Sequence, residues 1–462
     1  MNDSTPRDTG KHYSPRAFLA AIGQLLGMYA IWKPIEDTVR LHQKTLKHTP
    51  LDKLKDAFIT ILAGARGRIE VEKRLRNDPV LQHAFGRNSC AEQSGIQDTL
   101  DASREENVTQ MQQALSDLYR KHSGGYAHNY QHAYQLLDAD MTGLVCGEKA
   151  QFATKGYFAG KPHHRGRQLA RCIATHYREI VCEQLYDGTH QLQAAFIPLV
   201  EQAEKVLGLD ADADKRRRTI LRVDSGAGTL ADINWALERG YAYHGKDFSG
   251  RRAQHLAQTV TQWIDDPKCP GRQVGWVTDA EQPYVRPLVR IAVRCRKANG
   301  QWAIGVLVSA LSAGEVIAAM RQPCHLSRDP QAVLLAYVYF YDARGGGIET
   351  INKEDKQGIG LNARNKKRFV AQQMLVLLAQ LAHNVIVWTQ RWLVGFTPKL
   401  VGYGILRMVR DVFTTSGFVQ TDAQGRVAQI VLNGHDPLAQ GLVDALRGLL
   451  QKEHILVNSG ET

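Results

Sequence analysis

The hydrophobic pattern of the chain changes at one point, the Ser123-Gly124-Gly125 break, and this change most constrains the fold. From Pro15 to about Lys121, apolar residues recur every three to four positions, as in AFLAAIGQLLGMYAIW and LDKLKDAFITILAGA, a period typical of helices. Beyond the break, strand-like runs such as AYQLLDADM and EIVCEQLYDGT precede an alternation of strand (RTILRVDSG), helix (TLADINWALERG) and strand (YAYHGKDF). The sequence therefore predicts an N-terminal helical region followed by an α/β or α+β sheet domain.

The segment 250–336 has a different pattern, dominated by one predicted hairpin. In PLVRIAVRCRKANGQWAIGVLVSAL, two alternating runs flank Asn299-Gly300, and Asn-Gly tolerates the positive φ angles of a type I′ turn. Further along, apolar residues at helical spacing predict one long core helix over 365–393. The remaining sequence predicts a second hairpin, GFVQTDAQGRVAQIVL, and a helix, LAQGLVDALRGLLQK.

Charge and composition narrow the classes of function. Lys and Arg number 58 against 46 for Asp and Glu, a net charge of +12, which suits a polyanionic partner. The seven cysteines are scattered and never spaced C-x-x-C, so we expect reduced thiols, with no zinc site and no disulfide framework. The N-terminus is polar, and no apolar run approaches the ~20 residues of a membrane span. We therefore expect a cytoplasmic protein that is neither exported nor embedded in a membrane.

Carboxylates stand at the ends of two strand-like runs. Asp138 and Asp140 lie at the end of QLLDADMTG, at i and i+2, and so face one side of a strand. Asp224 ends RTILRVDSG, where an apolar strand meets a glycine-rich turn, and the ends of such strands commonly carry active sites. This turn lacks the G-x-x-x-x-G-K-[ST] and G-x-G-x-x-G patterns of nucleotide-binding loops. Taken alone, Asp138 and Asp140 are a weak signal, since an aspartate at a strand end is more often a turn or capping residue.

A third carboxylate, Glu349, precedes Lys356 by seven residues, which is two turns along one helical face. Taken alone, this spacing is also that of a solvated helix. Transfer at a phosphodiester is helped by two divalent ions about 3.5–4 Å apart, and hard cations prefer carboxylate oxygens. Such chemistry would require the three carboxylates to converge in space.

These stretches together resemble the catalytic core of bacterial insertion-sequence DDE transposases, the cut-and-paste group with the signature Y-x2-R-x3-E-x6-K. LDADMTG resembles the family's first-aspartate strand with its D-x-T ending, LRVDSG resembles the second, and the signature matches Tyr341, Arg344, Glu349 and Lys356. The resemblance spans roughly 125–395. It implies an RNase H-like core that is interrupted, between the second aspartate and the glutamate, by a mostly β insertion.

The resemblance also implies roles for single residues. Asp140, Asp224 and Glu349 would be catalytic and would bind two Mg²⁺ ions, which Mn²⁺ can replace. Tyr341, Arg344 and Lys356 would contact DNA phosphates near the cleaved bond. The D-x-T ending favours Asp140 over Asp138. The basic runs KRRR (215–218) and KKR (366–368) would extend a positive channel, although charge runs are usually solvated faces.

One departure from the signature lies between Arg344 and Glu349, where four residues stand in place of three. The segment Gly345-Gly346-Gly347 disfavours helix, so we expect the extra residue in a loop before the helix that carries Glu349. Glu354 and Asp355 remain alternative ligands.

The expected function is therefore a DDE transposase that binds terminal inverted repeats and catalyses DNA cleavage and strand transfer. Its partners would be double-stranded DNA, as transposon ends and target, and a second copy in a homodimer, with no membrane and no small-molecule cofactor. The alternatives are a transposase-derived DNA-binding protein without cleavage activity and an RNase H-like nuclease without strand transfer. The predicted division is a helical DNA-binding domain (1–124), a catalytic core in two parts (125–249 and 337–395), a β-rich insertion (250–336) and a C-terminal region for dimerisation or DNA contact (396–462).

Overall fold

The computed structural model describes residues 10–44, 47–66, 70–158, 161, 163–279, 283–422 and 426–460. The chain forms two compact units. The first, here called the helical unit, comprises Met1–Ser123, Leu144–Ala153 and Ile351–Thr462. The second, the sheet unit, comprises Gly124–Gly143 and Thr154–Thr350.

The sheet unit is built on one mixed ten-stranded sheet in the order β3-β4-β2-β6-β7-β11-β10-β9-β8, with β5 paired to β4. Strands β2, β6 and β7 pair in parallel, and the pairs from β7 through β11, β10 and β9 to β8 are antiparallel. The strands are β2 (Gln135–Val145), β3 (Thr154–Lys155), β4 (Arg165–Ala174), β5 (Glu179–Asp187), β6 (Thr219–Val223), β7 (Ala242–Lys246), β8 (Ile264–Asp265), β9 (Arg272–Trp276), β10 (Val289–Arg296) and β11 (Trp302–Ser309).

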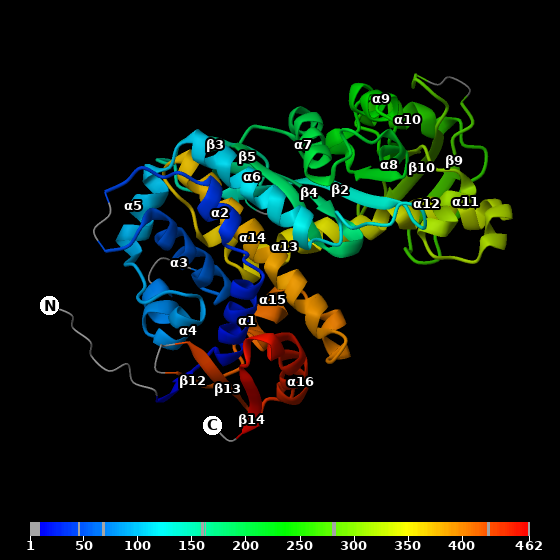
Figure 1. Cartoon of the computed structure of the whole chain (residues 1–462). Helices are drawn as coiled ribbons and strands as arrows, with labels where there is room; N and C mark the ends of the chain where they lie inside the picture. The colour runs from blue at the N-terminus through cyan, green and yellow to red at the C-terminus, as the bar shows by residue number, and fades with distance from the viewer. Residues whose placement is uncertain are drawn as a thin grey trace. The chain divides into compact units, whose positions relative to one another are not determined.

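Helices cover both faces of this sheet (Figure 1). Every residue of β6 is buried, as expected for a parallel strand between two helical layers. On one face lie α7 (Leu192–Leu207), α9 (Leu230–Glu238) and α10 (Gly250–Gln258), and on the other lie α11 (Ala313–Ala319) and α12 (Pro330–Arg344). The short α8 (Ala213–Arg217) precedes β6. Apolar residues of α12, including Tyr337 and Phe340, share one buried cluster with strand residues such as Ile220 and Ile291.

The strands of segment 250–336 continue the sheet formed by the preceding strands. β11 pairs with β7, with Val308 opposite Gly245, and its Leu307 belongs to the same buried cluster as Leu136 of β2. The residues predicted as a β-rich insertion thus share a sheet and a core with the strands that carry the aspartates.

The predicted hairpin at Asn299-Gly300 is confirmed as β10–β11, but the predicted type I′ turn is wrong. That turn needs positive φ at both central residues, and here only Gly300 has it, at +79°. The Lys297 N–H donates to the Gln301 carbonyl over 2.8 Å, which closes a three-residue loop. A left-handed glycine at the end of such a loop is the common three-residue alternative to type I′.

The helical unit gathers around α14 (Phe369–Leu393), the helix predicted over 365–393. By length and composition α14 alone among the described helices could cross a membrane, yet 94% of its most apolar window is buried, as in a core helix. It packs against α3, α5 and α6. The other helices are α1 (Ala17–Met28), α2 (Lys33–Thr38), α3 (Pro50–Leu62), α4 (Pro79–Ala84), α5 (Gln93–Ala102), α6 (Glu105–His122), α13 (Thr350–Gly358), α15 (Ile405–Arg407) and α16 (Ala439–Leu450).

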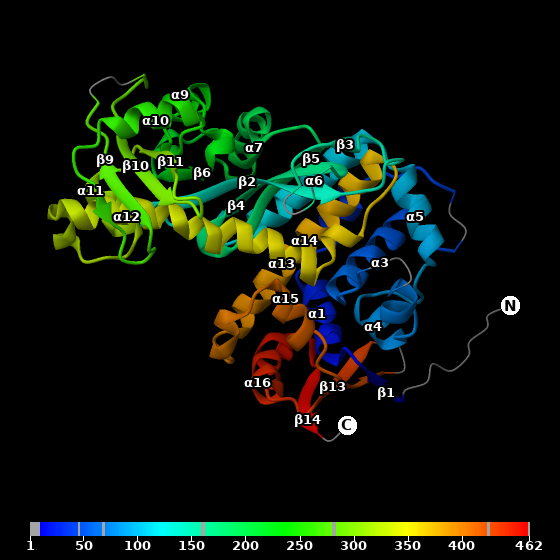
Figure 2. The same ribbon diagram turned by 180° about the vertical axis from the view of Figure 1, so that it is seen from behind.

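A four-stranded sheet completes the helical unit, in the order β1 (Lys11–Ser14), β12 (Gly417–Thr421), β13 (Val427–Asn433) and β14 (Leu456–Gly460). The predicted C-terminal hairpin is the antiparallel pair β12–β13, and its turn at 423–425 lies outside the described residues. Figure 2 shows α16 beside β13 and β14, and α1 also packs against this sheet. The sequence did not predict β1 and β14, which extend the hairpin on both sides.

Candidate active site

Asp140 and Asp224 lie next to each other on adjacent parallel strands of the sheet unit. In the register of β2 and β6, Ala139 pairs with Val223, and the next residue on each chain is the aspartate. β6 ends at Val223, so Asp224 follows the strand directly. One Asp224 carboxylate oxygen accepts the Gly226 N–H at 2.7 Å, which fixes the turn that leads to α9. The other oxygen remains available to the site.

Asp138 has a structural role, because both of its carboxylate oxygens bind Arg222. Arg222 Nε lies 2.6 Å from one oxygen and Nη2 lies 2.7 Å from the other, and both side chains are almost fully buried. Arg222 Nη1 also donates to the Phe340 carbonyl over 2.6 Å. The pair therefore ties β2 and β6 to α12. Asp140, whose side chain is 13% exposed, remains as the β2 aspartate that is accessible for chemistry.

Glu349 is carried by a π-helical turn, Gly345–Glu349, that joins α12 to α13. The expected break at Gly345-Gly346-Gly347 is a kink between two helices at Gly347 and not an extended loop. A π turn accommodates one residue more than an α turn, so the extra residue between Arg344 and Glu349 is absorbed at the kink between α12 and α13.

Gly347 is the residue at which this turn departs from helical geometry, with φ −91° and ψ −107°. A Cβ atom at this position would lie 2.9 Å from an Asp138 carboxylate oxygen and 3.3 Å from Thr175 Cγ2. The close approach leaves no room for a side chain. The π turn thus rests directly on the buried Asp138–Arg222 pair.

The guanidinium of Arg344 brings the three predicted carboxylates together. Arg344 Nη2 lies 3.0 Å from Asp140 Oδ1 and 3.8 Å from Asp224 Oδ2, and Nη1 donates to Glu349 Oε1 over 3.1 Å. The Arg344 side chain is only 5% exposed, whereas those of Asp224 and Glu349 are 37% and 58% exposed. The site therefore opens to solvent on the carboxylate side, with the arginine beneath.

The electrostatics of this cluster are those of closely spaced like charges. Burial, helped by the charges of Asp224 and Glu349 and opposed by the charge of Arg344, raises the pKa of Asp140 to about 6. For Arg344, burial lowers the pKa, but Asp140 and Asp224 outweigh it and the net direction is upward. Burial also raises the pKa of Tyr341, one turn before Arg344, to about 12, so its phenol is neutral. Three carboxylates against one guanidinium leave an excess of negative charge when they are ionised.

Oxygen donors of this kind suit a hard divalent cation, but Arg344 now occupies the space between them. Among the described residues, no group of three or more His, Cys, Asp or Glu side chains is arranged to hold a metal ion. The buried guanidinium acts as a stand-in cation, since it contacts all three carboxylates at once. The donor set fits Mg²⁺ or Mn²⁺ in its chemistry, provided that the arginine moves away.

Lys246 is a cation near this site that the sequence analysis missed. It ends β7, the parallel strand next to β6, and Val223 pairs there with Gly245, so Lys246 lies in register beside Asp224. Its ammonium lies over Gly305 of β11 and forms no hydrogen bond or ion pair with the described residues. With Tyr341 and Arg272 it lines a hollow of about 170 Å³. Active sites commonly lie at the ends of such strands, which is why Asp224 was a candidate, and the same reasoning would have indicated Lys246.

The remaining predicted residues lie elsewhere. Lys356 belongs to the helical unit, and its contact with DNA stays a prediction. The two alternative ligands are engaged inside that unit: Glu354 accepts the Ile405 N–H at 2.8 Å, and buried Asp355 binds His383 Nδ1 at 2.8 Å. These contacts favour Glu349 as the third carboxylate.

The basic run 215–218 makes local contacts. Arg216 donates to the Arg239 carbonyl over 3.0 Å, Arg217 pairs with Asp214, and Arg218 donates to the Tyr130 carbonyl over 3.0 Å. The Arg218 guanidinium also lies over the Tyr134 ring. These contacts give the run a structural role beside the start of β6.

Comparison with known proteins identifies no sequence relative, since no family model and no curated protein matches the chain. Among solved structures, the chain is similar to a piggyBac transposase in a synaptic complex with hairpin DNA. The TM-score is 0.44 and the sequence identity 12%, over 95% of this chain and 82% of that chain. A likeness of this size does not establish an activity for this protein.

Proposed function

We propose that this protein is a DDE transposase, a metal-dependent enzyme that cuts DNA at the ends of a mobile element and joins them to a target. The observation that carries the proposal is the convergence of Asp140, Asp224 and Glu349 on the single guanidinium of Arg344. These carboxylates come from three distant segments of the chain. A structural role alone does not account for the partial exposure of Asp224 and Glu349 beside a buried cation.

In the proposed enzyme, Asp140, Asp224 and Glu349 hold two Mg²⁺ or Mn²⁺ ions. Such ions would activate the attacking oxygen and neutralise charge on the leaving oxygen. The residues of the chain position the DNA. Arg344 exchanges the carboxylates for a phosphate, which it can bind through two parallel hydrogen bonds. Tyr341 donates its neutral hydroxyl, and Lys246 adds a positive charge on the Asp224 side of the site.

The proposed partner is double-stranded DNA, bound by a homodimer. A net charge of +12 favours association with a polyanion, and phosphate contacts make such binding salt-dependent. Lys356 and the predicted N-terminal helical domain would contribute further DNA contacts. The sheet unit would be the RNase H-like part of the enzyme.

The test is a cleavage and strand-transfer assay on DNA that carries the inverted repeats flanking the gene, with Mg²⁺ or Mn²⁺. We expect the wild-type protein to yield both cut ends and joined product, and Asp224→Asn to yield neither. Asp214→Asn is the matched control, because Asp214 is an exposed aspartate of the same unit that only pairs with Arg217. It should retain full activity.

The same assay separates the alternatives. Cut ends without joined product would identify an RNase H-like nuclease, and specific binding to the repeats without cutting would identify a DNA-binding derivative. Absence of wild-type activity on the correct ends would overturn the proposal.

A further inference from the structure

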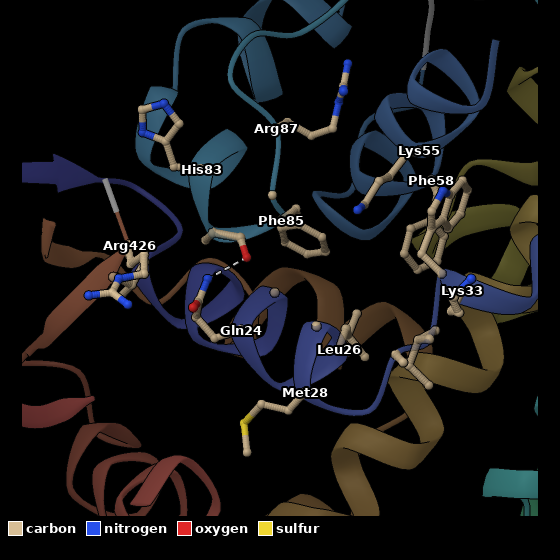
Figure 3. A pocket seen from close by; sticks show the side chains of 18 of the residues that line it. Gln24, Leu26, Met28, Lys33, Lys55, Phe58, His83, Phe85, Arg87 and Arg426 are labelled. Carbon is tan, nitrogen blue, oxygen red and sulfur yellow. Dashed lines mark hydrogen bonds between the residues drawn. The ribbon is translucent and has the colours of Figure 1, made fainter. Parts of the chain in front are cut away.

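The helical unit contains a cavity of about 640 Å³ in which the candidate active site has no part. Its walls are the C-terminal end of α1, the start of α2, one side of α3 and the segment 83–88 that follows α4 (Figure 3). Small-molecule sites typically occupy about 300–1,000 Å³, so the volume is that of a ligand pocket.

Aromatic rings make one part of the wall. Trp32, Phe58 and Phe85 border the cavity, with the ring centroids of Trp32 and Phe58 5.6 Å apart, and most of each side chain is packed against protein, since they are 7%, 2% and 5% exposed. The backbone next to Phe85 is anchored to α1, because Gln24 Nε2 donates a hydrogen bond to the carbonyl of Ala84, the preceding residue, over 2.7 Å (Figure 3). The side chain of Phe85 is also held by α1, since a Cβ added to Gly23 would lie 2.6 Å from the Phe85 ring. The apolar wall is therefore preformed.

One cation in the lining differs from the others. Three basic residues of the lining are bound to carboxylates, namely Lys33 to Asp37, Arg87 to Asp52 and Asp56, and Arg426 to Asp422. Lys55, on α3, forms no hydrogen bond or ion pair with the described residues. Its ammonium points into the cavity toward Phe85 (Figure 3).

The surroundings of Lys55 favour an external anion. Burial lowers the pKa of Lys55, because the ammonium is partly removed from water and forms no direct ion pair with the described residues. Glu36 and Glu453 also line the cavity, and the charge of Glu36 partly offsets the effect of burial. An anionic group placed on Lys55 would gain a charge-assisted hydrogen bond in a partly dehydrated position.

We propose that this cavity binds a small organic anion, with its apolar body inside the cavity and its anionic group on Lys55. The chemical class is an aromatic sulfonate, carboxylate or phosphate. The proposal is independent of the function proposed above, because the site shares no residue with the carboxylate cluster and its test uses neither DNA nor metal.

The test uses two probes of nearly the same shape, titrated by fluorescence into the full-length protein without DNA or metal. One is 8-anilinonaphthalene-1-sulfonate, and the other is the neutral N-phenyl-1-naphthylamine, which lacks the sulfonate. We expect Lys55→Met to weaken sulfonate binding roughly tenfold and to leave the neutral probe within about twofold. Lys33→Met, which removes a lining cation already paired with Asp37, should change neither. Lys55→Arg should restore binding of the sulfonate.

A second variant tests whether the probes occupy this cavity. Gly27 lines it, and a Cβ added there meets no atom within 4 Å, so Gly27→Phe extends into open space from a helical position. We expect this variant to keep the wild-type circular dichroism spectrum and melting temperature and to lose saturable binding of both probes. Unchanged sulfonate affinity in Lys55→Met, or unchanged binding in a folded Gly27→Phe protein, would overturn the proposal.

Discussion

Arg344 Nη2 lies 3.0 Å from Asp140 Oδ1, and the same guanidinium contacts Asp224 and Glu349. A buried arginine in this position partly neutralises three carboxylates at once. It also competes with a metal ion, because the ion and the guanidinium would use the same oxygens.

This competition predicts that Arg344→Gln strengthens Mn²⁺ binding in the absence of DNA. In EDTA the variant should be less stable than wild type by about 3 kcal/mol, because the carboxylates lose a largely buried counter-charge. Mn²⁺ should then raise its melting temperature more than that of the wild-type protein. Thermal unfolding with and without Mn²⁺, together with electron paramagnetic resonance of bound Mn²⁺, measures both effects. Equal Mn²⁺ affinity in the two proteins would contradict the competition.

The raised pKa of Asp140 predicts a stability change with pH in EDTA. The folded state holds the Asp140 proton up to about pH 6, whereas the unfolded chain releases it near the ordinary pKa of 3.8. The folded state therefore binds more protons between these values, and stability falls as pH rises through this window. Asp140→Asn should be more stable than wild type at pH 7, with a difference that narrows toward pH 4. Urea unfolding at several pH values tests this, and a constant difference would contradict it.

The Asp138–Arg222 pair predicts opposite consequences for the two neighbouring aspartates of β2. Asp138→Ala leaves Arg222 buried without its carboxylate and should cost about 3–5 kcal/mol of folding free energy. Asp140→Ala should abolish DNA cleavage and leave a folded protein. Urea unfolding and the cleavage assay, run on both variants, separate the roles. A stable but inactive Asp138→Ala protein would contradict the structural role given to Asp138 and would make it a candidate catalytic residue.

The π turn predicts that Gly347 and Gly346 respond differently to the same added methyl group. A Cβ at Gly347 would meet the Asp138 carboxylate at 2.9 Å, whereas a Cβ at Gly346 meets no atom within 4 Å. Gly347→Ala should lower the unfolding free energy by about 1–3 kcal/mol, the range for an overpacked site, and reduce cleavage. Gly346→Ala is the control and should remain folded and active. Equal effects of the two changes would argue against the close approach.

The position of Lys246 predicts a contribution to DNA binding that is electrostatic. Lys246→Met should weaken affinity for DNA ends and reduce the slope of log affinity against log salt by about one. Lys297→Met, in the exposed turn of the β10–β11 hairpin, is the matched control and should leave the slope unchanged. Fluorescence anisotropy over a range of salt concentrations gives both slopes. Identical slopes for Lys246→Met and wild type would exclude the contact.

Local sequence patterns predicted the strands that carry Asp140 and Asp224, since an apolar run that ends in a polar residue and a turn is a short-range signal. They also predicted the β10–β11 hairpin and the core helix α14. They did not predict that β7 pairs with β11, because strand order depends on contacts between distant segments. β1 was missed for the same reason: KHYS has little strand character of its own and forms a strand by pairing with β12.

Within the candidate site, the sequence indicated which residue types belong together but not their contacts. The signature places an arginine at position 344 but does not say whether its side chain contacts DNA or three carboxylates. That depends on the burial and direction of the side chain, which the sequence pattern does not give. The glycine-rich segment predicted a break before the helix that carries Glu349, and the break is shorter than the expected loop. Glycine disfavours helix on average, and here the three glycines form a π turn with a kink at Gly347, so the helical direction changes without a long loop.

The parallel pairing of β2 with β6, and the return of α12 onto the same sheet, also have a consequence for biosynthesis. These contacts join segments far apart in sequence, and long-range pairing forms slowly during folding. During translation, Asp140 and Asp224 are synthesised before Arg344 and Glu349. The carboxylate cluster is therefore completed late, after most of the polypeptide has been made.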